Sequence, residues 1–298
     1  MNPIMITKAR ETRRGHRLLP ELLKDLAAAA ALMILPQTLA AALAIDLGYA
    51  QDSAGATLLM LWAQGLTLLM TILYCRFLQR RTADSIGLPL RGAAKGWLSG
   101  AAHGFSLMAS AAAVGVLTGT YAFSGFAAPI RPAALFLLLI GYILQGMAEE
   151  MLCRGFLLVS LARKNAVSAA VIVSSLFFAL IHLPNDGVTP LCMINLLLFS
   201  LLASLLMLRD GHLWHVGALH AMWNFSQQGI FGFPVSGIAP QDALLRLTLV
   251  GSPLSGGGAF GPEGGLIVTA VLAVELAAFA LQHRAAARTP SACAQETP

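Results

Sequence analysis

The sequence predicts an all-α, multi-pass integral membrane protein, a helical bundle with about eight transmembrane helices. Hydrophobic residues make up 57% of the 298-residue chain and charged residues only 11%, whereas an ordinary soluble domain has about 25% charged residues. Apolar stretches recur along the chain, each near the ~20 residues with which a helix crosses a bilayer. These stretches are residues 26–45, 54–75, 97–121, 132–148, 166–181, 188–208, 213–231 and 264–281.

The distribution of Lys and Arg predicts the orientation of the helices. Cytoplasmic flanks of membrane proteins collect basic residues, and an even number of spans places both termini on one side. With both termini in the cytoplasm, all of the 19 Lys and Arg residues except Arg131 and Arg246 fall on the cytoplasmic side. The net charge of +5 therefore indicates contact with the lipid bilayer and no nucleic acid partner. The Ala- and Leu-rich spans favour a bacterial inner membrane.

The first apolar stretch is expected to remain in the protein as a helix kinked near Pro36. Its basic leader of about 25 residues and its long uncharged run both exceed what a cleaved signal peptide needs. The predicted organisation is a basic cytoplasmic tail, residues 1–25, an eight-span membrane domain, residues 26–282, and a C-terminal cytoplasmic tail, residues 283–298.

The remaining connections carry little sign of chemistry. Residues 232–263 form a long outer connection with three consecutive glycines from Gly256, and they predict a mobile loop. The cysteines have no CxxC spacing, so we expect packing residues and neither a disulfide framework nor a thiolate zinc site. They are Cys75, Cys153, Cys192 and Cys293.

Two adjacent glutamates, Glu149 and Glu150, follow directly on the charge-free stretch 132–148. Ionisable groups at membrane depth are expensive, so this pair is a functional-site hypothesis by default. At 100° per residue along a helix, Arg154 lies about 40° from Glu150 but about 140° from Glu149. We therefore expect an ion pair between Glu150 and Arg154, which leaves Glu149 free.

Three further polar residues, His182, His220 and Asn224, lie at or within the predicted spans. Counted from the nearest cytoplasmic basic residues, Glu149 lies at most roughly 21 Å deep, His182 roughly 27 Å and Asn224 roughly 22 Å. They can therefore share one layer. A carboxylate and an imidazole can deprotonate a water, and an imidazole and an amide can donate to an oxyanion. Glu149, His182 and His220 could instead hold a zinc ion, and the residues alone leave both chemistries open.

Four other polar residues in or beside the spans are interpreted more plainly. His103 is expected to be a hydrogen-bonded packing residue. His212 and His215 are expected to lie at the membrane interface near Trp214. Glu275 is expected to face the bundle and find a hydrogen-bond donor there.

The motifs carry a resemblance to a known family when they are taken in chain order. Glu149-Glu150-x-x-x-Arg154, Phe178-x-x-x-His182 and His220-x-x-x-Asn224 resemble the intramembrane proteases of the CPBP group, the CAAX protease and bacteriocin-processing family. That group includes the Ras-converting type of CAAX prenyl endopeptidase and bacterial relatives named Abi proteins. The resemblance covers roughly residues 85 to 230, the expected catalytic core, and Ile86-Gly87-Leu88 is similar to the family's opening.

The resemblance implies an endopeptidase that cuts membrane-associated or lipidated proteins and peptides within or beside the bilayer. It implies that Glu149 and His182 activate the water and that His220 and Asn224 stabilise the oxyanion. Glu150 and Arg154 would be the supporting pair.

Other interpretations remain open at this point. The family is commonly labelled metalloprotease, although this chain has no HExxH. A proton-coupled transporter could use Glu149, Glu150 and Glu275, but it predicts related sequence halves, and none are found. A non-proteolytic scaffold or bacteriocin-immunity protein would not depend on Glu149.

Overall fold

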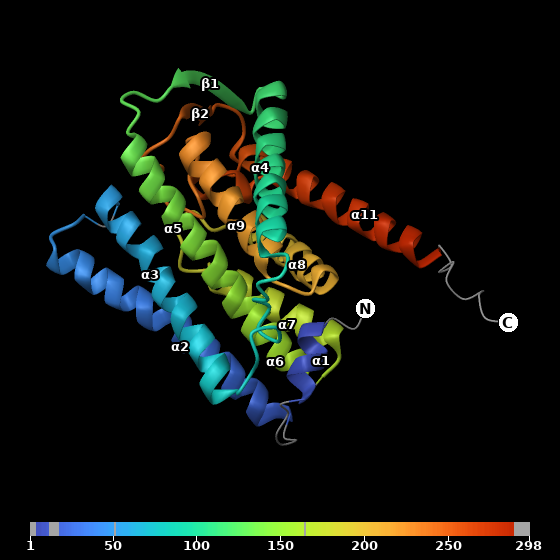
Figure 1. The fold of residues 1–298 in the computed structure, drawn as a ribbon. Helices are drawn as coiled ribbons and strands as arrows, with labels where there is room; N and C mark the ends of the chain where they lie inside the picture. Colours follow the sequence, from blue (N-terminus) through green and yellow to red (C-terminus); the bar gives the residue numbers. More distant parts are fainter. Residues whose placement is uncertain (1–3, 12–17, 51, 164, 289–298) are drawn as a thin grey trace.

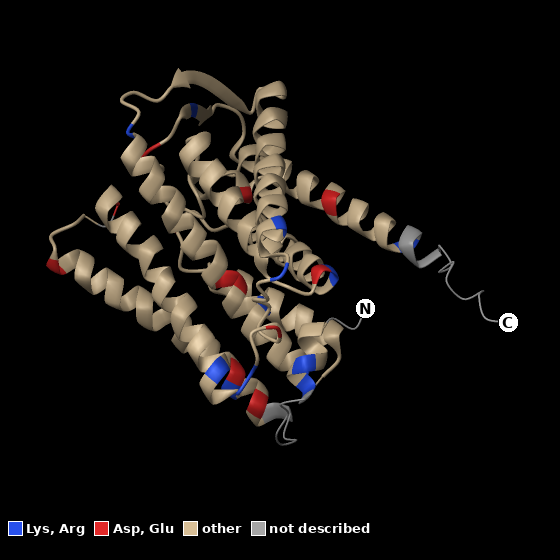
Figure 2. Ribbon diagram, in the orientation of Figure 1, with Lys and Arg blue, Asp and Glu red and all other residues tan. Residues whose placement is uncertain are grey.

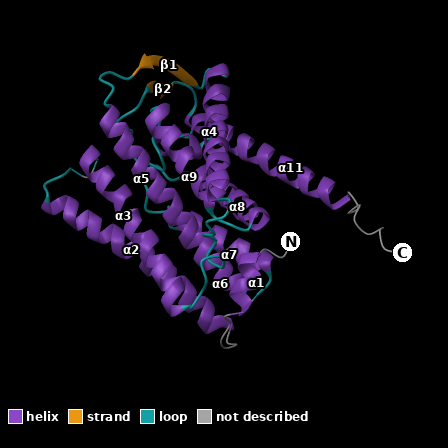
Figure 3. Ribbon diagram, in the orientation of Figure 1, coloured by secondary structure: helices purple, strands orange, loops and turns teal. Residues whose placement is uncertain are grey.

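The computed structural model describes residues 4–11, 18–50, 52–163 and 165–288, and these form a helical bundle with one two-stranded sheet at one end (Figures 1 and 3). The longer helices are α2 (Leu18–Asp46), α3 (Ala54–Leu73), α4 (Ala93–Leu117), α5 (Pro132–Glu150), α7 (Val167–Leu180), α8 (Pro190–Asp210), α9 (Trp214–Phe225) and α11 (Leu266–Arg288). The short helices are α1 (Ile4–Glu11), α6 (Val159–Ala162) and α10 (Pro253–Gly256). Strand β1 (Tyr121–Phe126) pairs antiparallel with β2 (Leu245–Leu249).

Three helices continue into π-helical turns, and two 3₁₀ turns precede α11. The π-helical turns are Tyr74–Leu78 after α3, Met151–Leu158 after α5 and Ser226–Ile230 after α9. The 3₁₀ turns are Gly258–Phe260 and Pro262–Gly264. Such π-helical turns are rare and are frequently found at functional sites.

The fold confirms an all-α, multi-pass membrane bundle. All eight predicted stretches are helical, but only six helices in the described chain are long and apolar enough to cross a membrane on their own. The two that are not are α7, with 14 residues, and α9, with 12. The count of eight spanning helices is therefore not confirmed, because these two helices are short. Helix α2 stays helical through Pro36.

The N-terminal region is more structured than a tail. Helix α1 lies within the predicted tail, residues 1–25, and α2 begins there as well. Lys8 of α1 forms an ion pair with Asp84 in the connection between α3 and α4. Figure 2 shows Lys and Arg gathered mainly toward the end of the bundle where α1 lies, with few beside β1 and β2. The predicted cytoplasmic tail after residue 282 includes the last turn of α11 and then residues 289–298, which lie outside the described residues.

Helix α9 lies at the centre of the bundle because glycines on its neighbours allow close approach. An added Cβ at Gly100 or Gly104 of α4 would lie 2.1 Å from a backbone carbonyl oxygen of α9. On α5, a Cβ at Gly146 would lie 2.6 Å from the amide nitrogen of Ala221. Small residues at four-residue spacing are the usual device for packing membrane helices backbone to backbone. They bring α4 and α5 against the helix that carries His220.

The connection between α9 and α11 is folded, so the prediction of a mobile loop was wrong. Residues Leu245–Leu249 form β2, Phe260 is fully buried, and Glu263 is only 8% exposed. The side chain of Asn195 on α8 donates to the carbonyl oxygens of Glu263 and Gly265, at 2.8 and 3.0 Å. Glycine content indicated flexibility, whereas here the glycines allow tight packing beneath the sheet. The described cysteines, Cys75, Cys153 and Cys192, are buried and free, and Cys293 lies outside the described residues.

Candidate functional site

Glu149 and Glu150 end α5 and lie in the interior of the bundle. Their exposed fractions are 2% and 0%, and that of Arg154, in the following π-helical turn, is also 0%. Arg154 Nη1 donates to Glu150 Oε1 at 3.1 Å, so the predicted ion pair is confirmed. Arg154 Nη2 donates to the carbonyl oxygen and hydroxyl of Ser200 on α8, at 2.9 and 2.7 Å. A buried guanidinium needs such additional acceptors because charge in a low dielectric is otherwise too costly.

His220 of α9 joins the two glutamates. Its Nδ1 lies 2.9 Å from Glu150 Oε1, the oxygen that also accepts from Arg154. Its Nε2 lies 3.8 Å from Glu149 Oε2, which has no hydrogen-bond partner. Glu150 therefore orients the imidazole and the guanidinium together, whereas Glu149 keeps a free carboxylate oxygen beside the ring.

His182, like His220, is hydrogen-bonded through its Nδ1 atom. Its Nδ1 lies 2.8 Å from the carbonyl oxygen of Phe178 one turn earlier. A carbonyl oxygen can only accept, so Nδ1 carries the hydrogen and Nε2 of the neutral ring is free to accept a proton. His182 is 8% exposed, and its ring lies tilted against that of Phe178, with the ring centroids 4.9 Å apart.

Asn224 is linked to a polar residue that sequence reasoning missed. Its Nδ2 donates to Gln145 Oε1 at 3.1 Å, and its Oδ1 is buried without a partner. Gln145 lies one helical turn before Glu149 on α5. A glutamine interrupting an apolar stretch at four-residue spacing from Glu149 was a usable signal, because both side chains then project from the same face.

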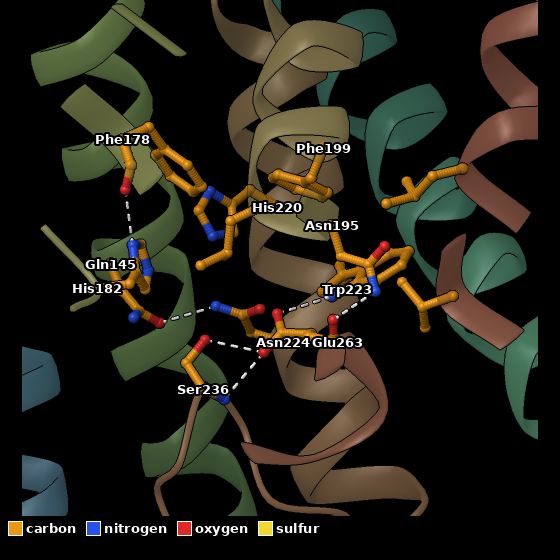
Figure 4. A pocket seen from close by; sticks show the side chains of 13 residues that line it. Gln145, Phe178, His182, Asn195, Phe199, His220, Trp223, Asn224, Ser236 and Glu263 are labelled. Atoms are coloured by element: carbon orange, nitrogen blue, oxygen red, sulfur yellow. Dashed lines mark hydrogen bonds between the residues drawn. The ribbon is translucent and has the colours of Figure 1, made fainter. Parts of the chain in front are cut away.

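A small enclosed cavity lies between these side chains (Figure 4). Its volume is about 20 Å³, which is room for about one water molecule. His182, His220 and Asn224 line it together with Gln145 and Phe178. The predicted histidines and asparagine therefore do meet around one water-sized space.

A second cavity lies beside the first, toward α2 and α3. Its volume is about 580 Å³, and Glu149, His182 and Gln145 lie in its wall. Its remaining wall is mainly apolar, from α2, α3 and the turn around Ser236. Because His182, Gln145 and Ser236 line both cavities, the larger cavity lies directly beside the water-sized one.

Glu263 is the second residue of this site that sequence reasoning missed. Its carboxylate accepts from Trp223 Nε1 at 3.2 Å and from the amide and hydroxyl of Ser236, at 2.9 and 2.8 Å (Figure 4). It holds the turn that separates the two cavities. No spacing in the sequence links Glu263 to the motifs, since it comes from a connection predicted to be mobile.

The predicted zinc ligands do not form a ready set. Among the described residues, no three His, Cys, Asp or Glu side chains lie close enough together to hold a metal ion. Glu149 and His220 approach each other to 3.8 Å, while His182 is turned toward the carbonyl of Phe178. His182 and His220 line the water-sized cavity, whereas Glu149 lines the larger one, so the three side chains as they stand do not form a tetrahedral ligand set.

The fold and the buried polar layer define a multi-pass helical membrane protein with a cluster of ionisable side chains at its centre. Residues 131–226 match the family described as type II CAAX prenyl endopeptidase Rce1-like. The match confirms the predicted resemblance, and it covers this segment of the chain alone. No curated protein and no solved structure gives a significant match to the chain.

Proposed function

We propose that the protein is an intramembrane endopeptidase in which Glu149 and His182 activate a water molecule. The observation that carries the proposal is the free carboxylate oxygen of Glu149, which is buried beside His220 and belongs to a residue lining the larger cavity, next to the water-sized space. A buried carboxylate without a partner is costly to keep, so a catalytic role accounts for it better than a structural one.

The proposed reaction follows from the free atoms of these side chains. Glu149 or Nε2 of His182 takes a proton from the water, and the resulting hydroxide attacks the carbonyl carbon of the peptide bond. The developing oxyanion accepts from the second Nδ2 hydrogen of Asn224 and from His220 when that ring is doubly protonated. The carbon–nitrogen bond then breaks as the protonated base returns the proton to the leaving amine. Glu150 and Arg154 line neither of these two cavities and act by fixing His220.

The larger cavity supports a membrane-embedded or lipidated peptide as the substrate. Its volume of about 580 Å³ and its methionines and leucine on α2 and α3 suit an apolar chain. Gln64 of α3 is 5% exposed and its carboxamide makes no hydrogen bond within the described chain. We expect it to bind the amide groups of an extended substrate backbone. The printed family name refers to CAAX prenyl endopeptidases, and a prenylated C-terminal peptide is therefore one substrate to test.

The proposal is tested with the purified protein in proteoliposomes and a panel of quenched fluorescent membrane peptides, with and without a prenylated cysteine. Wild-type protein is expected to cleave at least one of them, and Glu149→Gln is expected to abolish that cleavage. Asp242→Asn is the matched control, because this carboxylate is paired with Arg131 on the outer connection and lines neither cavity. Cleavage by Glu149→Gln at the wild-type rate would contradict the assignment.

The role of a metal is tested separately. Metal content is measured in active protein before and after treatment with a chelator. We expect full cleavage in metal-free protein if Glu149 activates the water directly. Stoichiometric zinc that is lost in His182→Ala and His220→Ala would instead favour the metalloprotease interpretation.

A further inference from the structure

A second chain of polar side chains, each half-buried, joins four helices away from the proposed active site. Asp210 ends α8, His215 lies in α9, His103 in α4 and Glu275 in α11. Asp210 Oδ2 lies 2.9 Å from His215 Nδ1, His215 Nε2 lies 3.2 Å from His103 Nδ1, and His103 Nε2 lies 3.1 Å from Glu275 Oε1. We call these four residues the histidine relay.

Counting hydrogens shows what the histidine relay requires. A carboxylate can only accept, so the two outer ring nitrogens must both carry hydrogens. If both rings are neutral, that leaves two bare lone pairs facing each other at 3.2 Å. One additional proton between the rings completes all three hydrogen bonds. Without it, one of the three contacts becomes a repulsion between lone pairs or between a lone pair and a carboxylate.

The surrounding charges are few and can be named. Arg209 donates to Asp210 at 2.7 and 3.2 Å, and its Nη2 is also 3.5 Å from His215 Nδ1. His212 lies in the turn before α9, where burial lowers its pKa, so it adds little positive charge near neutral pH. Apart from Arg209, the groups facing the two rings are therefore the carboxylates of Asp210 and Glu275.

We propose that the histidine relay is a proton-binding site, and that the proton bound between His103 and His215 fastens α11 to the bundle. Helix α11 has few other polar attachments. Within the described residues, its only other polar side chain bonded to a neighbouring helix is Thr269, which donates to Asn195 at 2.7 Å. Only 22% of the apolar part of α11 is buried, and Figure 1 shows the C-terminal half of this helix leading away from the other helices.

Binding of the proton affects the proposed active site through the position of α11. Val268 and Leu272, within two turns of Glu275, line the water-sized cavity together with His182 and His220. When the proton leaves to solvent, Glu275 loses its fully bonded partner and this wall is released. The effect on peptide cleavage rests on the proposed function, whereas the attachment of α11 does not.

The attachment is measured by the distance between spin labels on Leu98→Cys of α4 and Leu281→Cys of α11 in nanodiscs. Both side chains are exposed, at 70% and 65%. Cys293→Ser is included in every protein, and the three buried cysteines are kept. The distance distribution is recorded from about pH 5 to about pH 9, the range around ordinary imidazole titration. We expect one narrow distribution at the acidic end and a broader or shifted one at the alkaline end.

Two variants at one position make the result specific. Glu275→Gln can donate to His103 Nε2, so two neutral rings then complete every hydrogen bond, and its narrow distribution should persist at all pH values. Glu275→Leu removes the contact and should give the broad distribution throughout. A wild-type distribution that does not change with pH, or Glu275→Gln behaving like Glu275→Leu, would overturn the proposal. So would broadening on addition of EDTA at acidic pH, because a metal ion and not a proton would then join the rings.

Discussion

The two polar clusters of this membrane domain differ in how completely their charges are paired. In the first, Arg154 and His220 both bind one oxygen of Glu150, and Glu149 beside them keeps an oxygen with no partner. In the histidine relay, each carboxylate meets a ring or a guanidinium, and the side chains remain 12 to 27% exposed. A fully paired, partly exposed cluster can hold helices together. A buried cluster in which Glu149 Oε2 and Glu150 Oε2 both lack hydrogen-bond partners carries a cost in stability, and the proposed chemistry at Glu149 accounts for part of it.

The largest expected effect that tests this difference between the two clusters is at Glu149. Glu149→Gln is expected to lower kcat by about 10²- to 10⁴-fold, the usual loss for a general base, while the thermal unfolding temperature stays close to wild type because no bonded partner is lost. Kinetics on a cleavable peptide and unfolding in detergent measure the two effects. A large loss of stability with little loss of activity would make Glu149 a structural residue.

Arg154 provides the opposite pattern. Arg154→Ala leaves Glu150 buried without its cation, and we expect a loss of about 3 to 5 kcal/mol in unfolding free energy. Arg131→Ala is the matched control, since its 56% exposed side chain pairs with Asp242 at the surface and should cost about 1 kcal/mol or less. If both variants unfold like wild type, the buried pair does not support the fold.

Gly104 affects both clusters, because α4 carries His103 and α9 carries His215 and His220. In Gly104→Ala the new Cβ would lie 2.1 Å from the carbonyl oxygen of Leu219, so the helices must separate at a cost of about 1 to 3 kcal/mol. The control is Gly65→Ala, whose Cβ would lie 3.5 Å from Leu144 and should be tolerated. Equal stability of the two variants would argue against backbone contact between α4 and α9.

Gln64 tests whether the first cluster receives its substrate through the larger cavity. Gln64→Leu keeps the size of the side chain but removes a hydrogen-bonding group, and we expect KM to rise by the equivalent of about 1 kcal/mol with kcat nearly unchanged. The comparison of kcat with KM on one peptide measures this. A fall in kcat alone would indicate that Gln64 acts in the chemical step and not in substrate binding.

The smallest effect is expected at Glu275. At alkaline pH, Glu275→Gln should be as stable as wild type or slightly more stable. Its unfolding free energy should be higher by no more than about 1 kcal/mol, because it completes the relay without an added proton. At acidic pH the two proteins should not differ measurably. A clear loss of stability at both pH values would show that the charge of Glu275 itself is needed.

Much of the fold followed from composition, and the central pair followed from spacing. Apolar stretches predicted every long helix, and four-residue spacing predicted the contact between Glu150 and Arg154, although the chain there is π-helical. The contact of His220 with Glu150 could not be predicted, because it depends on the glycines that let α5 and α9 approach. Glu263 was missed since a glycine-rich connection indicates mobility unless its packing partners are known. His103 and Glu275 were each expected to find a partner, but their being partners of one another required the arrangement of α4 and α11.

The enclosure of α9 has a consequence for how the chain enters the membrane. None of its 12 residues is exposed, and it is absent from the helices able to cross a bilayer by length and composition. The insertion machinery selects apolar segments of about 20 residues, and α9 has only 12. Its placement must therefore follow that of α4, α5 and α8, whose surfaces replace lipid around it. The helix that carries His220 is thus a late product of assembly, and variants that slow the packing of its neighbours should lose activity before they lose membrane integration.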